Sequence, residues 1–244
     1  MTKRVETYGS VAGLLSERML RTAAMVSPGS RTADVGCDHA YTSVYLVEQG
    51  IAPRVVAMDV NKGPLARAAE NVAKFGMQEQ ISLRLSDGLE ALIPGEADTI
   101  LIAGMGGPLT ERILSAYPEV LATAKELVLQ PQSEIAEVRR FLHRAGFRIT
   151  AEDMLIEDGK YYVILRAEHG QEDEWTEEEY DYGKRLKSEA YPVLREFLSM
   201  ERRKAEEVLR GLEKAGTQKA KKRMENLLLS LKRNACMCEK LAEK

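Results

Sequence analysis

The sequence predicts an α/β fold with a mostly parallel, doubly wound sheet, followed by a helical appendage. Three observations predict it. Short apolar runs alternate with helical stretches from Arg31 to about Ala167. The pair Asp158-Gly159 joins two strand-like runs and indicates one antiparallel hairpin at the end of that region. Beyond the hairpin, apolar residues recur at helical spacing towards the C-terminus.

The elements follow in order along the chain. An amphipathic stripe predicts one helix over Ser10 to Val26, which Ser27-Pro28-Gly29-Ser30 ends. Apolar runs bounded by turn residues then predict strands at 32–35, 54–58, 81–85, 99–103, 127–130, 148–156 and 161–166. Helical patterns between them predict helices at 41–49, 64–75, 108–115 and 134–144.

The C-terminal part has a different character. The acidic stretch Glu168 to Asp181 is predicted to be a linker, within which Thr176 begins a helix through a capping box. Pro192 should kink or restart that helix. Two apolar stripes separated by a turn at Ala215-Gly216-Thr217 predict an antiparallel, coiled-coil-like pair. We therefore divide the chain into residues 1–167 and a helical domain of residues 168–244.

Charge is distributed unevenly within a net charge of −3. Residues 199–244 hold 13 Lys and Arg against 7 Asp and Glu, a charge of +6, whereas the remainder carries −9. A basic tail on an acidic body indicates a negative partner such as nucleic acid, and the alternative is a solvated helical face. The candidate RNA-binding residues are Arg202, Arg203, Lys204, Lys219, Lys221, Lys222 and Arg223.

Membrane and metal sites have little support in the sequence. No apolar run approaches the roughly 18 residues that span a bilayer, so we expect a cytoplasmic protein that needs no membrane. The three cysteines do not form a disulfide framework. Cys236-Met237-Cys238 lacks the two-residue spacer of zinc sites, which favours packing over metal binding.

The first candidate site is the turn after the first strand, Asp34-Val35-Gly36-Cys37-Asp38. Its single glycine does not make a dinucleotide fingerprint, which needs three. Asp34 and Asp38 would repel a pyrophosphate, but they would attract the sulfonium and ammonium groups of S-adenosylmethionine. The turn therefore favours S-adenosylmethionine over NAD, and the structural alternative is an ordinary strand-to-helix turn.

Three further candidates follow later strands at the same predicted edge of the sheet. Asp59, with Asn61, can accept ribose hydroxyls, or else cap the next helix. Asp87-Gly88 can receive an adenine ring, or form a type I turn. The run Ala103-Gly104-Met105-Gly106-Gly107 predicts an open loop for the methionine end of the cofactor and a target base, the alternative being a flexible connector.

These runs together carry a family resemblance. Residues 14–167 resemble the bacterial TrmK family of tRNA (adenine(22)-N1)-methyltransferases. The resemblance lies in Leu15-Ser16-Glu17-Arg18, Asp34-Val35-Gly36-Cys37-Asp38-His39-Ala40-Tyr41, Asp87-Gly88-Leu89, Ala103-Gly104-Met105-Gly106-Gly107, Leu127-Val128-Leu129-Gln130-Pro131 and Glu157-Asp158-Gly159-Lys160. Gln132 departs from the family, which usually has Asn after Gln-Pro.

The resemblance implies a Rossmann-like class I methyltransferase domain that methylates N1 of adenine 22 in the D-arm of tRNA. It implies that S-adenosylmethionine lies against Asp34, Gly36, Asp38, Asp59, Asn61, Asp87, Gly88, Ala103 and Gly104. The candidate catalytic residues are Asp38, His39, Tyr41 and Met105.

The chemistry sets modest demands on these residues. N1 of adenine already has a lone pair, so the site must align the reactants, exclude water and stabilise positive charge on the base, which Asp38 can do. Two alternatives remain open: a methyltransferase for another RNA, a protein or a small molecule, and a non-catalytic RNA-binding protein that retains the fold.

Overall fold

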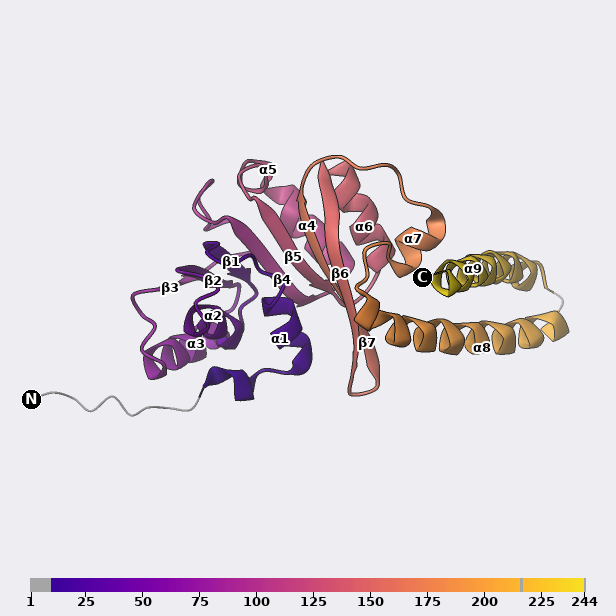
Figure 1. Ribbon diagram of the computed structural model, residues 1–244, viewed down its shortest axis with the longest axis horizontal. Helices are drawn as coiled ribbons and strands as arrows, with labels where there is room; N and C mark the ends of the chain where they lie inside the picture. Colours follow the sequence, from indigo (N-terminus) through magenta and orange to yellow (C-terminus); the bar gives the residue numbers. More distant parts are fainter. Residues whose placement is uncertain (1–9, 216, 244) are drawn as a thin grey trace, which may run out of the picture.

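A seven-stranded, doubly wound sheet forms the centre of the molecule (Figure 1). The computed structural model describes residues 10–215 and 217–243. The strands are β1 Thr32–Val35, β2 Val55–Asp59, β3 Ile81–Leu85, β4 Thr99–Met105, β5 Glu126–Pro131, β6 Phe147–Glu157 and β7 Lys160–His169. Their order is β3-β2-β1-β4-β5-β7-β6, with β1 to β5 parallel and β7 antiparallel to both neighbours. The predicted Rossmann-like methyltransferase sheet, with its one antiparallel strand, is confirmed.

Each predicted helix of the sheet domain after residue 40 is present, and two short helices, Pro118–Leu121 and Ser188–Ala190, were not predicted. They are η1 Val11–Leu14, α1 Glu17–Ala23, α2 Tyr41–Glu48, α3 Lys62–Lys74, α4 Gly107–Ala116, α5 Pro118–Leu121, α6 Ile135–Arg144, α7 Glu177–Tyr182, η2 Ser188–Ala190, α8 Tyr191–Ala215 and α9 Gln218–Ala242. The single helix predicted over residues 10–26 is wrong. Leu15 is extended, and the Ser16 side chain accepts a hydrogen bond from the Met19 backbone, so a new helix begins there.

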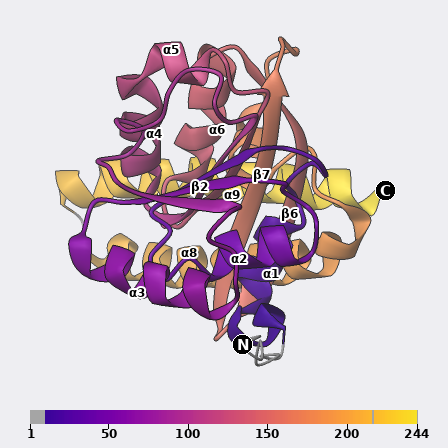
Figure 2. The same cartoon turned by 90° about the vertical axis from the view of Figure 1, so that its left-hand side faces the viewer.

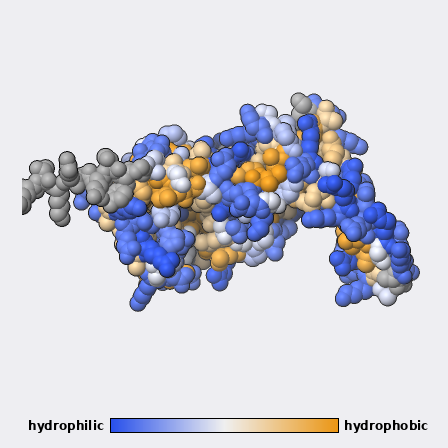
Figure 3. Space-filling view, turned by 90° about the horizontal axis from the view of Figure 1, so that it is seen from below, coloured by the Kyte–Doolittle hydropathy of each residue, from blue (hydrophilic) through white to orange (hydrophobic). Residues whose placement is uncertain are grey.

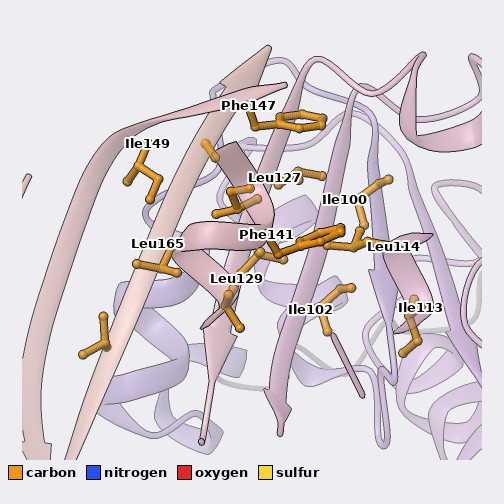
Figure 4. Close-up of a cluster of buried hydrophobic side chains, with 14 of the residues drawn as sticks. Ile100, Ile102, Ile113, Leu114, Leu127, Leu129, Phe141, Phe147, Ile149 and Leu165 are labelled. Atoms are coloured by element: carbon orange, nitrogen blue, oxygen red, sulfur yellow. The ribbon is translucent and has the colours of Figure 1, made fainter. Parts of the chain in front are cut away.

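Alternate residues of the central strands face two separate hydrophobic clusters. On β4, Ile100 and Ile102 pack with α4 and α6, whereas Leu101 packs with α2 and α3. Figure 4 shows Phe141 of α6 lying over the strands beside Leu129. Figure 2 shows α4, α5 and α6 on one side of the sheet and α1 and α2 on the other. Burial on both faces explains the continuous apolar runs in the sequence.

The acidic stretch predicted to be a linker is instead packed against the sheet domain. Trp175 and Tyr180 are buried in the main cluster. Arg139 and Glu152 form a buried ion pair, and Arg139 Nη1 donates to the carbonyl of Tyr180 at 2.7 Å. The linker prediction fails because these apolar and hydrogen-bonded residues outweigh the acidic character of the segment. The capping box at Thr176 is confirmed at the start of α7.

Helices α8 and α9 pair antiparallel and project from the body as an arm (Figure 1). Pro192 lies in the first turn of α8, so a helix restarts there. At the base of the arm, Leu198 of α8 and Leu241 of α9 are buried in the cluster that also contains Leu165 of β7. The predicted turn includes Gly216, which lies outside the described residues. The domain boundary after residue 167 stays a prediction.

The membrane and metal predictions can be compared with residues 10–215 and 217–243. Within these ranges, every helix is too short or too polar to cross a membrane. The same residues contain no group of three or more His, Cys, Asp and Glu side chains that could hold a metal ion.

Candidate functional site

A pocket of about 290 Å³ opens at the carboxyl edge of the sheet, where the loop after β1 meets the end of β4. This is the edge at which doubly wound sheets bind ligands. Leu15, Arg18 and Met19 of the η1–α1 segment form its opposite wall. The pocket brings together seven of the predicted site residues, namely Asp34, Gly36, Asp38, His39, Tyr41, Ala103 and Gly104.

The turn after β1 is tightly folded around Gly36. The backbone N–H groups of Gly36 and Cys37 both donate to the carbonyl of Met58, at 2.8 and 2.9 Å. Gly36 has a φ of +73°, and a Cβ there would collide with the methyl group of Met105, which reaches across from β4. The positive φ favours glycine at this position, and the end of the flexible Met105 side chain lies against it.

Asp34 is a buried carboxyl group at the end of β1. Only 4% of the residue is exposed, and one carboxyl oxygen accepts a hydrogen bond from Ser43 Oγ at 2.6 Å. Burial and, to a smaller extent, the nearby Asp59 raise its pKa to about 6, against the lowering effect of the Ser43 hydrogen bond. A cationic group bound in the pocket would favour the ionised form of Asp34.

Asp59 ends β2 and links two turns. Its Oδ1 accepts from the backbone N–H of Asn61 at 2.8 Å, and its Oδ2 accepts from that of Asp38 at 3.3 Å. Each oxygen keeps a lone pair for a further donor. Val60 and Leu85 beside it are 58% and 51% exposed, so they form an apolar ledge next to the carboxylate. This ledge was not identified from the sequence. Its signal in the sequence was the presence of apolar residues, Val60 and Leu85, at the ends of two strands.

Gly88 packs against α4, whereas the sequence indicated a contact with the adenine ring of the cofactor. It has a φ of +63°, and a Cβ there would lie 3.0 Å from the side chain of Ile113 on α4. Ser86 Oγ donates to its carbonyl at 2.9 Å, which fixes the turn. Asp87 is exposed at the same edge. The assignment of Asp87 and Gly88 to the cofactor site stays a prediction.

The loop after β4 is packed where we predicted it to be open. Gly107 is buried, its N–H donates to the Ser133 carbonyl at 3.1 Å, and a Cβ there would lie 2.5 Å from that same oxygen. Gly106 precedes α4 as its N-cap. The open-loop prediction is therefore wrong for Gly107, because its contact with the backbone of the β5–α6 loop leaves no room for a side chain. Gly106 is half-buried, and a Cβ there would lie 3.1 Å from the Ser133 hydroxyl. Gly104 alone is exposed, and it lines the pocket.

Arg18 of α1 holds the wall of the pocket in place. Its Nη1 donates to Gln130 Oε1 at 2.5 Å, and its backbone N–H donates to Glu157 Oε1 at 3.0 Å. Its guanidinium lies 5.0 Å from the ring centroid of Tyr162. Sequence reasoning gave Arg18 no role, and its only signal was the run Leu15-Ser16-Glu17-Arg18.

The predicted RNA-binding residues lie on the arm. Arg202 is half-buried beside Cys238, and the other six are exposed, namely Arg203, Lys204, Lys219, Lys221, Lys222 and Arg223. A shallow groove of about 370 Å³ on α9 is lined by Lys219, Lys222 and Arg223 together with Gln218 and Asn226. Seen from below, hydrophilic side chains cover most of the arm, and apolar patches interrupt the surface of the body (Figure 3). The expected outward orientation is confirmed for these six side chains.

The strand order, the glycine turn after β1 and the acid that ends β2 define a Rossmann-like class I methyltransferase domain. A family model described as "Methyltransferase domain" matches residues 15–165. The tRNA (adenine(22)-N1)-methyltransferase of Bacillus subtilis is 40% identical over 159 residues, which cover 65% of this chain and 67% of that protein.

Solved structures match over a larger share of the chain. The Bacillus subtilis m1A22 tRNA methyltransferase TrmK covers 91% of this chain and 97% of its own, with a TM-score of 0.81 and 30% identity. Streptococcus pneumoniae Sp1610, solved in complex with S-adenosyl-L-methionine, covers 91% and 98%, with a TM-score of 0.78 and 34% identity. The chain belongs to the TrmK family.

Proposed function

We propose that this protein transfers a methyl group from S-adenosylmethionine to N1 of the adenine at position 22 of tRNA. The observation that carries the proposal is the pocket at the carboxyl edge, in which Asp34 and Asp38 flank the Gly36 turn beside Asp59. The name of the Bacillus subtilis relative and the ligand of the Streptococcus pneumoniae structure support the substrate and the cofactor.

The residues of the pocket, together with Asp59, Val60 and Leu85 outside its lining, fit S-adenosylmethionine. Asp59 would hold the ribose hydroxyls, and the Val60–Leu85 ledge beside it offers apolar surface for the adenine ring. The buried Asp34 would face the cationic methionine end. Gly36, Ala103 and Gly104 allow close approach of the backbone. When bound, the cofactor supplies an electrophilic methyl group.

The protein's own residues then align the base and exclude water. N1 of adenine has its own lone pair, so no side chain has to remove a proton before transfer. Arg18 fixes α1 as a wall over the pocket, which limits the access of water. The Asp38 side chain is 67% exposed and lies 3.6 Å from His39, so it is free to stabilise the positive charge of the methylated base. Tyr41 and Met105 shape the surfaces beside it.

The arm supplies the second contact with tRNA. A base that is stacked or paired must leave its stack before N1 can reach the methyl group. Exposed cations on α8 and α9 bind phosphate without reading sequence, so they hold the tRNA while the base enters the pocket. The proposal places the protein in the cytoplasm, together with its substrate.

A transfer assay tests this function. Purified tRNA is incubated with the protein and cofactor carrying a labelled methyl group, in parallel with other RNAs, protein and small molecules. We expect label only in tRNA. Label in another class of acceptor, or in none, would contradict the proposal.

A further inference from the structure

Two glutamines flank Pro131 at the end of β5, and they differ in burial and in the hydrogen bonds of their side chains. Gln130 is fully buried, its Oε1 accepts from Arg18 Nη1 and from the Gly104 N–H, and its Nε2 donates to the Pro131 carbonyl at 3.3 Å. Gln132 is exposed, and its side-chain amide makes no hydrogen bond with residues 10–215 or 217–243. Gln130 is therefore committed to structure, whereas the Gln132 amide is free for a ligand.

The backbone beneath Gln132 is fixed from both sides. The Gln132 N–H donates to the Met105 carbonyl at 2.9 Å, and the carbonyl of the next residue, Ser133, accepts from Gly107 at 3.1 Å. The backbone that carries the amide is therefore fixed beside the end of β4, which gives a recognition group a defined base. Its Nε2 lies 3.8 Å from the point that a Cβ on Gly104 would occupy. Gly104 lines the pocket and Gln132 does not, so the amide lies just outside the pocket, next to one of its lining residues.

We infer that Gln132 recognises the target adenine through its N6 and N7 atoms. This inference rests on the proposed function. A carboxamide presents one donor and one acceptor side by side, which match N7 and the N6 amino group of adenine. Contact at that edge leaves N1 free to face the methyl group. Guanine carries an oxygen in place of N6, so its edge would place two acceptors together, and the same amide discriminates against it.

A double-mutant cycle, in which one change is made in the protein and one in the tRNA, tests the contact. Gln132→Met keeps the length of the side chain and removes both hydrogen-bonding groups. It is compared with the unchanged protein on tRNA that has adenine or 7-deazaadenine at position 22. We expect Gln132→Met to lower kcat/KM by about tenfold to a hundredfold, which corresponds to one bidentate contact. 7-Deazaadenine removes only the hydrogen bond to N7, so we expect a smaller loss from it. Gln132→Met should cost less on 7-deazaadenine than on adenine, because part of the same contact is already absent there.

Two controls separate this result from general damage. Gln132→Met should leave the dissociation constant for S-adenosylmethionine unchanged. Gln78→Met, at an exposed glutamine in the turn before β3, should keep normal kcat/KM. The inference would be overturned if the losses of kcat/KM from Gln132→Met and from 7-deazaadenine multiplied fully. It would also be overturned if the Gln132→Met protein had normal activity. Failure of the unchanged protein to methylate adenine 22 would instead contradict the proposed function.

Discussion

Arg18 Nη1 and Gln130 Oε1 lie 2.5 Å apart, and the same oxygen accepts from the Gly104 N–H at 3.1 Å. One buried oxygen therefore connects the helix that covers the pocket, the end of β5 and the loop that lines the pocket. A hydrogen bond to a charged donor is among the stronger ones in proteins. These hydrogen bonds therefore fix the wall and the lining of the pocket relative to each other, which lowers the ordering cost of binding.

Arg18→Ala should loosen this wall. We expect the free energy of unfolding to fall by about 1.5–3 kcal/mol, typical for removal of a charged hydrogen bond, and the affinity for S-adenosylmethionine to fall with it. Chemical denaturation and calorimetric titration measure the two effects. Arg21→Ala on the same helix is the control, because its more exposed ion pairs with Glu17 and Asp153 contribute only about 0–1 kcal/mol. Equal effects of the two substitutions would contradict the role of Arg18.

Asp59→Ala should weaken cofactor binding about tenfold to a hundredfold, because it removes a charged acceptor worth about 1.5–3 kcal/mol. It also removes the acceptor for the Asn61 and Asp38 backbone groups. Asp59→Asn keeps one oxygen for those groups, so its fold should be closer to normal. Calorimetry on both proteins, with the exposed Asp173→Ala as control, measures the loss. Unchanged affinity in a folded Asp59→Ala protein would remove Asp59 from the site.

Binding of S-adenosylmethionine should strengthen as pH rises from 5 to 7. The Asp34 pKa of about 6 lies above its ordinary value, so near pH 5 the folded protein holds a proton that a cationic ligand must displace. We expect the dissociation constant to fall about tenfold across this range and then level off. By the same linkage, ionisation of the buried Asp34 lowers the free energy of unfolding as pH rises from about 4 to about 6. Asp34→Asn should bind more weakly and lose this part of the pH dependence, and an unchanged pH profile would contradict the assignment.

The arm should control affinity for tRNA but not for cofactor. Alanine at four exposed cations of α9 should weaken tRNA binding, and it should reduce the slope of log K against log salt by about 0.7–0.9 for each phosphate that the protein no longer neutralises. These cations are Lys219, Lys221, Lys222 and Arg223. Substitution is a cleaner test than deletion, because Met237 and Leu241 of α9 are buried in the core.

Two exposed acids on α8 provide an opposite control for the arm. Glu206→Gln with Glu207→Gln removes negative charge from the same arm and should strengthen tRNA binding. Filter binding over a salt series measures both variants. Unchanged affinity and slope in the alanine variant would show that the arm only stabilises the fold.

The sheet was predictable because its signals are local. Apolar runs such as Ile100–Ile102 are continuous because both faces of the strand are buried, and turns with glycine or Asp-Gly bound them. The acidic stretch around Trp175 was misjudged because its packing depends on Arg139 and Glu152, which are distant in sequence. Composition describes the average polarity of a segment, not the partners that bury it.

The site was predictable to the same extent. Asp34 and Asp59 lie at the carboxyl ends of β1 and β2, and Gly36 follows β1 directly, so topology alone brings them to one edge. The contact between Arg18 and Gln130 spans 112 residues and carries no local pattern. Gly107 shows the opposite case: the glycine run was clear in the sequence, but the reason for glycine at this position is close packing against the Ser133 backbone.

Nucleoside mass spectrometry of tRNA after incubation with the protein and S-adenosylmethionine tests the central claim most directly. Two transcripts are compared, one with adenine at position 22 and one with guanine there. We predict 1-methyladenosine in the first and none in the second. The absence of 1-methyladenosine from the first, or equal amounts in both, would contradict the account.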